Sequence, residues 1–298
     1  MLTSAIDRYL ELRRALGHKL ETSECFLRSF ARYAASQRQS HITAASALTW
    51  ASQTASARQR AKRLTVLIGF ARFLRAEDAR HEIPPRTLIC PPTPRPPPYI
   101  LTQDEIQRLA HAASELPPRR SLRPLTFHTL FSLLATTGLR ISEALELRIG
   151  DFTRDGLVIR ETKFRKSRLV PLHESTAAAL TRYLARRQLL GPDTDHVFVS
   201  IRRTPICYET ARRTFRMLCN KVGLSGRVRL HDLRHTVAVR ALEACPKGHD
   251  QVTPHMLALS TYLGHASMRN TYWYLESTPQ LLRDIAEAGE AWIKGEAQ

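Results

Sequence analysis

Residues 126–147 read TFHTLFSLLATTGLRISEALEL, an apolar run of helical length followed by a second, shorter helical pattern. Gly138 closes the first run, as glycine commonly does just past a helix end, and Ile141 opens the second. Arg140 therefore stands at the junction between two expected helices, 126–137 and 141–147. Its side chain would project from a rigid corner of the backbone, which makes Arg140 a candidate for a fixed cationic group.

The remainder of the carboxy-terminal two thirds is also mostly helical in pattern. Thr102 and Glu105 form a capping box that opens a helix and a new domain. Between 157 and 172 the β-branched-rich runs LVIRET and RLVPL flank a polar, basic tip at 163–167, which predicts a β-hairpin. Further helices are expected over 175–190, 208–222, 233–243, 254–263 with Pro254 at the first position, and 279–292. The pattern predicts a mainly α fold with a small β-sheet.

The amino-terminal third is separated from the rest by proline. Residues 84–98 hold eight prolines among fifteen positions and predict an extended linker. Before it, four helices are expected, over 4–16, 22–36, 43–52 and 57–76. We therefore expect a helical domain over 1–82, a proline-rich linker over 83–99 and a second domain over 100–298.

The charge balance indicates a polyanionic partner. The chain has 45 lysines and arginines against 27 aspartates and glutamates, a formal net charge of +18, and only seven of the basic residues are lysines. Arginine binds phosphate through a planar, bidentate fork. In the expected helix 57–76, the residues outside the apolar stripe that would lie along a DNA backbone are Arg58, Arg60, Lys62 and Arg63. A solvated helix face is the alternative for these four.

Other classes of protein fit the sequence poorly. No apolar run is long enough to span a membrane, and the amino terminus is charged by its seventh residue, so neither a membrane partner nor a signal peptide is expected. The five cysteines are scattered without a C-x-x-C pair, which argues against disulfide scaffolds and most zinc modules. Cys245, His249 and His255 lack the spacing of metal ligands, so we expect no metal site. The expected location is the cytoplasm.

Four segments carry the residue types that phosphodiester cleavage needs when no metal takes part. The transition state requires cationic donors for its non-bridging oxygens, a nucleophile, and an acid for the leaving oxygen. The segments supply Arg140; Lys163 in the hairpin tip; His231 and Arg234, three residues apart at a helix start; and His265 just after Gly264, followed by Tyr272 and Tyr274.

The residues alone leave two choices open. Lys166 competes with Lys163 as the acid, whereas the arginines in the same turn hardly deprotonate and are poor proton donors. Tyr262, Tyr272 and Tyr274 are all candidate nucleophiles. Residues 272 and 274 would point about 200° apart on a helix, so one would face the phosphate while the other packs.

Together the four segments resemble the signature blocks of the tyrosine recombinase, or phage integrase, family. They are GLRISEALEL (138–147), the Lys163 hairpin ending in RLVPL, HDLRHT (231–236), and LGH (263–265) followed nine residues later by Tyr274, in the family's order. The resemblance runs from about 101 to 274, and the four-helix module with its linker resembles the family's SAM-like core-binding domain. The family's spacing favours Lys163 over Lys166 and Tyr274 over Tyr272.

The resemblance assigns the phosphate-binding roles. Arg140 and Arg234 would clamp the scissile phosphate, and His265 would donate a hydrogen bond to a non-bridging oxygen. Glu143, one turn after Arg140, would orient a catalytic side chain without reacting itself. Arg165 in the hairpin tip would contact DNA.

The resemblance also assigns the bond-making roles. Tyr274 would attack the phosphorus to give a 3′-phosphotyrosyl link, and Lys163 would protonate the departing 5′ oxygen. His231 would accept the tyrosine proton or hydrogen-bond the phosphate, although His231 and His265 could instead be core histidines, as we expect for His235. No cofactor, metal or ATP is implied, because the covalent link conserves the phosphodiester energy.

The implied function is that of a site-specific DNA recombinase of the phage integrase, Xer-like or transposon-encoded type. Its partners would be double-stranded DNA and sister protomers, in a homotetramer or in a mixed tetramer with related recombinases on two DNA sites. One alternative is a type IB topoisomerase-like relaxase, which acts alone on one duplex. Another is a DNA-binding regulator that keeps the fold without activity, but this alternative predicts a missing nucleophile or clamp residue, and none is missing.

Two features of the carboxy-terminal third stay open. His231 and His265 lie 34 residues apart, several more than in compact members of the family, and the extra length around 245–255 predicts a longer loop. The expected helix 279–292 has an apolar face that covers either its own core or a neighbouring protomer.

Overall fold

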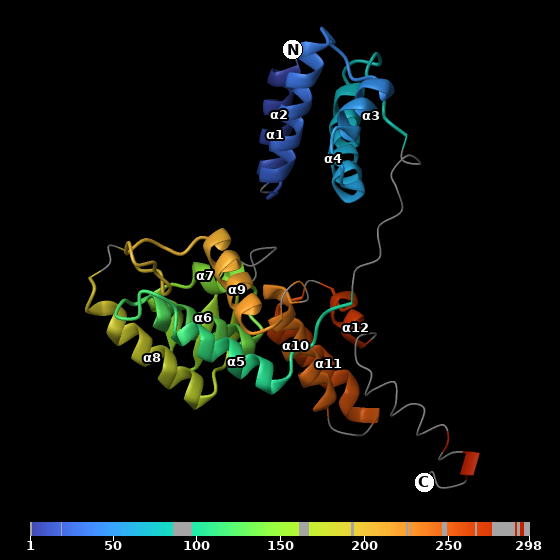
Figure 1. The fold of residues 1–298 in the computed structure, drawn as a ribbon. Coiled ribbons are helices and arrows are strands. Elements are labelled where there is room, and N and C mark those ends of the chain that lie inside the picture. The colour runs from blue at the N-terminus through green and yellow to red at the C-terminus, as the bar shows by residue number, and fades with distance from the viewer. Residues whose placement is uncertain are drawn as a thin grey trace. The chain divides into compact units, whose positions relative to one another are not determined.

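The computed structural model describes residues 2–294 except 19, 86–96, 161–166, 192–193, 225, 227, 246–248, 266, 276–289 and 291–292. The chain divides into two compact units, Met1–Pro96 and Pro97–Gln298, which are described separately. Helices dominate each unit (Figure 1), and the described residues form one three-stranded sheet. This confirms the expected mainly α fold with a small sheet. Most of the expected linker, and most of the expected helix 279–292, lie outside the described residues.

The described part of the first unit contains four helices, each within two residues of its expected bounds. They are α1 (Leu2–Ala15), α2 (Glu21–Ser36), α3 (Ala44–Ser52) and α4 (Ala57–Arg75). α3 starts at a capping box in which the Thr43 hydroxyl accepts from the Ser46 amide, and α4 starts at Ser56, whose hydroxyl accepts from the Gln59 amide. The expected apolar stripe of α4 is buried and packs against the other helices.

The second unit is built around α6 (Arg123–Thr137). This helix packs against α5 (Gln103–Ser114), α8 (Glu174–Gln188) and α10 (Leu230–Glu243). Because partners surround it, α6 is buried on most of its circumference, which explains its uniformly apolar sequence. The capping box expected at the start of α5 is present: the Glu105 carboxylate accepts from the Thr102 amide at 2.8 Å.

Four further α-helices are described in this unit. They are α7 (Ile141–Glu146), α9 (Tyr208–Lys221), α11 (His249–Leu263) and α12 (Arg269–Leu275). α10, α11 and α12 pack on one another around a small apolar cluster that includes Leu242, Leu259, Leu263 and Tyr274. Among the described residues, no helix is both long enough and apolar enough to cross a membrane.

The sheet is antiparallel with the order β1–β2–β3. Its strands are β1 (Phe152–Thr153), β2 (Gly156–Ile159) and β3 (Arg168–Val170), so the expected hairpin gains a third, two-residue strand. Gly156 has φ 132°, and a Cβ atom there would lie 2.3 Å from the Val170 carbonyl oxygen, so glycine is required where β2 begins. In the register of β2 and β3, Val170 pairs with Leu157 and Arg168 pairs with Ile159, so β3 begins at Arg168.

Three helix starts differ from expectation by three residues or more. α6 begins at Arg123 rather than 126, with Pro124 in its first turn, where a proline removes no hydrogen bond of the helix. α10 begins at Leu230 rather than 233, which places His231 and Arg234 in its first turns. α11 begins at His249 rather than at Pro254, so the expected longer loop before Pro254 is partly helix. The reason is that a proline near the start of a helix removes only one hydrogen bond, to the carbonyl four residues earlier, and the helix can extend ahead of it.

Candidate active site

Arg140 lies at the tight corner where α6 ends and α7 begins. Gly138 ends α6 with φ 62°, and a Cβ atom there would lie 3.1 Å from Val237 of α10 and 3.3 Å from Leu263 of α11. Glycine therefore lets three helices approach this corner. Arg140 is the N-cap residue of α7, and its amide donates to the Glu143 carboxylate at 2.9 Å while its guanidinium donates to the same carboxylate at 2.6 Å.

Glu143 lies between two arginines. Besides Arg140, it accepts two hydrogen bonds from Arg168, at 3.1 Å from Nη1 to Oε1 and at 2.8 Å from Nη2 to Oε2. Burial alone would raise the pKa of Glu143, but the hydrogen bonds and charge of Arg168, together with the amide and charge of Arg140, lower this pKa to about 2. The group is therefore a carboxylate at neutral pH and balances part of the surrounding positive charge.

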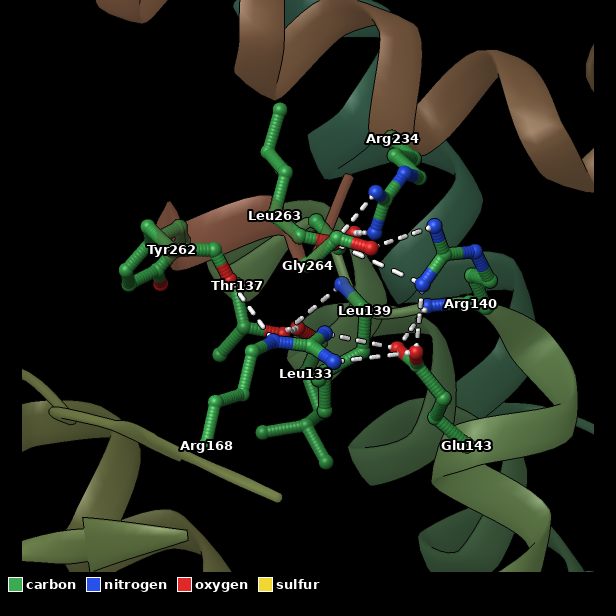
Figure 2. A network of polar contacts seen from close by, with 11 residues as sticks. Leu133, Thr137, Leu139, Arg140, Glu143, Arg168, Arg234, Tyr262, Leu263 and Gly264 are labelled. Atoms are coloured by element: carbon green, nitrogen blue, oxygen red, sulfur yellow. Dashed lines mark hydrogen bonds and ion pairs between the residues drawn. The ribbon is translucent and has the colours of Figure 1, made fainter. Parts of the chain in front are cut away.

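Three arginines bind three consecutive carbonyls at the end of α11, as Figure 2 shows. Arg168 Nε donates to the Tyr262 oxygen at 2.8 Å, Arg234 Nη2 donates to the Leu263 oxygen at 2.6 Å, and Arg140 Nη2 donates to the Gly264 oxygen at 3.0 Å. The last carbonyls of a helix have no partner within it and carry its negative dipole end. The end of α11 thus satisfies the arginines and reduces the repulsion among them.

Arg234 is the most deeply buried of the candidate residues on α10. It is 2% exposed, and its second nitrogen donates to the Gly138 oxygen at 2.7 Å. Burial, followed by the charge of Arg140, lowers the pKa of Arg234 to about 10, so it stays protonated at neutral pH. Arg140 Nη1 also lies 3.5 Å from the Leu263 oxygen that Arg234 binds, so the two guanidinium groups meet at one backbone carbonyl.

His265 is the residue after Gly264, and its ring faces Tyr274. Its Nδ1 lies 2.8 Å from the Thr271 hydroxyl, and its ring is stacked on the Tyr274 ring with centroids 5.9 Å apart. Tyr274 is 2% exposed and also meets the His235 ring edge-on, with centroids 5.3 Å apart. Tyr272, by contrast, is 53% exposed. The structure therefore brings Tyr274, rather than Tyr272, to the candidate histidines.

His231 lies on the first turn of α10, beside the same cluster. Its ring meets the His235 ring edge-on with centroids 4.5 Å apart. The residue as a whole is exposed, but crowding on its inner side removes solvent, and this desolvation with the charge of Arg234 lowers the pKa of His231 below its usual range. His231 is therefore neutral at pH 7 in the free protein and able to accept a proton.

The candidate acid belongs to the segment between β2 and β3. Lys163, Lys166 and Arg165 lie outside the described residues. The strands on either side are described: β2 ends at Ile159 and β3 begins at Arg168, whose side chain enters the cluster. Sequence reasoning missed Arg168 as a site residue and treated it as one more arginine of the hairpin. Its position at the start of RLVPL gave no sign that it would turn inward.

The four basic residues of α4 fall into two groups. Arg60 Nη1 donates to the carbonyls of Thr54 and Ala55, between α3 and α4, and Arg63 Nη1 donates to the carbonyl of Trp50, near the end of α3. Arg58 and Lys62 are exposed. Arg58 and Lys62 are therefore better suited to bind an external partner than Arg60 and Arg63, whose guanidinium groups already bind backbone carbonyls.

One histidine–aspartate cluster outside this site has the composition of a metal site. His41, Asp78 and His81 each have a potential ligand atom within 4.8 Å of the others'. However, the Ile42 amide donates to Nδ1 of His81 at 3.1 Å, so a neutral His81 carries its proton on Nε2, and Asp78 is engaged by Arg80 at 2.8 Å and by His41 at 3.2 Å. These bonds join the end of α4 to the segment before α3 and leave little free ligand capacity.

Gly264 provides a first prediction. Its φ is 65°, and a Cβ atom there would lie 2.6 Å from Nη1 of Arg168. We expect Gly264→Ala to lower the free energy of unfolding by about 2–3 kcal/mol, from left-handed strain and displacement of an anchored side chain. Gly223→Ala is the control, because Gly223 has φ 78° but open space around the missing Cβ, and should lose only about 1–2 kcal/mol. If urea unfolding shows equal losses of free energy for the two variants, the Arg168 side chain moves aside without cost and the prediction is wrong.

The pH dependence of stability provides a second prediction. Burial, then the charges of Arg234 and Arg140, lower the pKa of His265 to about 4, below its value of about 6.5 in an unfolded chain. Between these values the unfolded state binds more protons, so stability present above pH 6.5 is lost as the pH falls towards 4. His265→Gln should reduce the difference in unfolding free energy between pH 7 and pH 5 by about 1 kcal/mol, allowing for partial exposure. An unchanged difference in urea titrations would contradict this assignment.

Comparison with known proteins agrees with the sequence resemblance. The Phage integrase family model matches residues 100–280. The chain is 38% identical over 295 residues to the putative integrase/recombinase y4rB of Sinorhizobium fredii (strain NBRC 101917 / NGR234), covering 94% of both chains. It is 32% identical over 236 residues to the tyrosine recombinase XerD of Caulobacter vibrioides (strain ATCC 19089 / CIP 103742 / CB 15), covering 76% of this chain and 73% of XerD.

A solved structure agrees at the level of the fold. The XerH site-specific recombinase, in its post-cleavage complex with palindromic difH substrate, superposes with a TM-score of 0.69 at 18% identity, covering 91% of this chain and 80% of XerH. The family match spans the unit that holds the three-arginine cluster, His265 and Tyr274. The chain belongs to the phage integrase family and is a tyrosine-type site-specific recombinase.

Proposed function

We propose that this recombinase cleaves and rejoins double-stranded DNA through a covalent bond between Tyr274 and a 3′ phosphate. The observation that carries the proposal is the meeting of Arg140 and Arg234 at the Leu263 carbonyl, two residues before His265, whose ring stacks on Tyr274. A phosphate bound there meets two fixed positive charges and a neutral ring donor beside a phenol. Preorganised charges of this kind stabilise the negative charge that develops on the non-bridging oxygens.

The reaction then proceeds by one displacement at phosphorus. The Tyr274 oxygen bonds to phosphorus, the bond from phosphorus to the 5′ oxygen breaks, and the phenolic proton passes to His231. Lys163 gives a proton to the 5′ oxygen, which leaves as a hydroxyl. Attack by a 5′ hydroxyl on the phosphotyrosine reverses the steps, so the energy of the broken bond is kept and the cycle consumes no ATP.

The proposed partners are DNA and further copies of a recombinase. The formal net charge of +18 favours binding to DNA through phosphate contacts. The XerH relative is described as bound to its difH substrate, which supports duplex DNA as the substrate class. Exchange of strands between two sites requires four cleavages, which a tetramer of identical or related protomers would supply.

Trapping the covalent intermediate tests the proposal. The protein is incubated with fragmented genomic DNA, denatured in detergent, and the DNA that stays attached is sequenced. We expect adducts at recurring sequences, and we expect them to form in excess EDTA. A wild-type protein that forms no adduct would overturn the proposal, and loss of adducts on chelation would overturn its metal-free form.

A two-site assay separates recombination from relaxation. Two duplexes carrying the recovered sequence, with different labels, should yield recombinant strands. A protein that relaxes supercoiled plasmid but never exchanges labelled strands would be a relaxase instead.

A further inference from the structure

Arg168 occupies an unusual place for an arginine at the start of a strand. Its side chain is only 10% exposed, and its guanidinium donates two hydrogen bonds to the Glu143 carboxylate and one to the Tyr262 carbonyl. Arg140, by comparison, has a side chain that is 33% exposed. Arg168 is therefore the more deeply buried of the two arginines that bind Glu143.

Arg168 reaches Arg140 by two routes. Through Glu143, it holds both oxygens of the carboxylate that accepts the Arg140 amide and guanidinium. Through the Tyr262 carbonyl, it holds the segment whose next two carbonyls, at Leu263 and Gly264, accept from Arg140. Figure 2 shows the Glu143 carboxylate between the guanidinium groups of Arg168 and Arg140.

The packing leaves Arg168 little freedom. A Cβ atom on Gly264 would lie 2.6 Å from its Nη1 and 2.8 Å from its Cζ, so the turn that follows α11 rests directly on the guanidinium group. A shorter or uncharged side chain would leave Glu143 without its bidentate partner. The carboxylate, which already accepts from Nη1 of Arg140, would then be free to bind both terminal nitrogens of that guanidinium and draw it away from an incoming phosphate.

We propose that Arg168 is a positioning residue for DNA cleavage, which fixes Glu143 and the 262–264 turn so that Arg140 stays directed at the scissile phosphate. The proposal rests on the proposed function, because Arg140 binds the phosphate only in that reaction. Arg168 itself does not touch the DNA. Its effect is on the rate of adduct formation and not on the affinity for DNA.

Second-site suppression distinguishes positioning from simple structural support. The rate of adduct formation is measured in single turnover, on a duplex carrying the sequence recovered from wild-type adducts. We expect Arg168→Met to slow this rate about 100-fold, as small misplacements of catalytic groups do, with DNA affinity unchanged within about threefold. In Arg168→Met/Glu143→Gln the carboxylate that captures Arg140 is neutral, so the rate should recover about tenfold.

The remaining variants complete the test. Arg108→Met is the matched control, because Arg108 also binds one carboxylate, of Asp104, and one carbonyl, of Val222, but lies on α5 away from the cluster; it should cleave like wild type. Arg168→Lys keeps the charge without the bidentate fork and should slow adduct formation at least tenfold. If Arg168→Met fails to fold, this lysine variant decides the question.

Specific results would overturn the proposal. A double variant as slow as or slower than Arg168→Met, or a lysine variant with the wild-type rate, would show that Arg168 does not act by directing Arg140. Each of these outcomes compares a variant's rate of adduct formation with that of a wild-type protein that forms adducts. Failure of the wild type to form any adduct is a different result, and it would refute the proposed function instead.

Discussion

Tyr274→Phe should abolish the detergent-resistant adduct with DNA while leaving DNA binding intact. The substitution removes one oxygen atom, and no other atom of that side chain can bond to phosphorus. Removal of a nucleophile costs many orders of magnitude, so the rate should fall by at least about 10³-fold, to the limit of detection. Because the ring remains, its contacts with His265 and His235 can persist, and the fold should be preserved.

Tyr272→Phe is the matched control for that experiment. Tyr272 lies two residues earlier on the same helix and is 53% exposed, whereas Tyr274 is 2% exposed. The control should form adducts at a rate close to that of wild type. An adduct that persists in Tyr274→Phe and disappears in Tyr272→Phe would reverse the assignment of the nucleophile.

The burial of Tyr274 has a consequence for the order of events. A phenol that is 2% exposed does not reach a phosphate on a bulky duplex without some movement of α12, a helix of seven residues. Adduct formation should therefore be slower than DNA binding. Stopped-flow binding and quenched-flow adduct formation on the same duplex would measure the two rates.

Parts of the site were predictable from the sequence because they depend on local geometry. The corner at Arg140 requires only a glycine stop and the start of the next helix, both visible in GLRISE, and the structure has α6 and α7 meeting there. The capping box at Thr102 and the apolar stripe of α4 are local in the same sense. Each of these features depends on residues within two turns of one another.

Other parts depend on contacts between distant segments, for which the sequence carries no periodic signal. The carbonyls at the end of α11 meet arginines from α7, α10 and β3, which are 29 to 124 residues away. Nothing about Arg168 distinguishes it locally from the chain's other arginines, so its inward orientation appears only in the folded chain. The predicted start of α11 at Pro254 was also wrong, because the proline lies inside a helix that begins at His249.

Lys163→Ala should lose most DNA cleavage but regain it on a substrate in which sulfur replaces the 5′-bridging oxygen at the scissile phosphate. An alkoxide leaving group needs a proton as it departs, and general acids contribute about 10²–10⁴-fold to such steps. A thiolate is a far weaker base and leaves without a proton. The variant should therefore cleave ordinary DNA about 10²–10⁴-fold more slowly than wild type and cleave the sulfur substrate at a similar rate.

Lys166→Ala is the control that decides between the two lysines of the segment before β3. Both lie on the segment between Ile159 and Arg168, and both carry the same charge, so loss of a general electrostatic contribution to DNA binding would affect the two variants alike. Only loss of the acid produces a defect that sulfur repairs. If Lys166→Ala shows the repaired defect, the proton donor is Lys166; if neither variant is repaired, the proton comes from another group near the cluster, and His231 becomes the first residue to test in the same way.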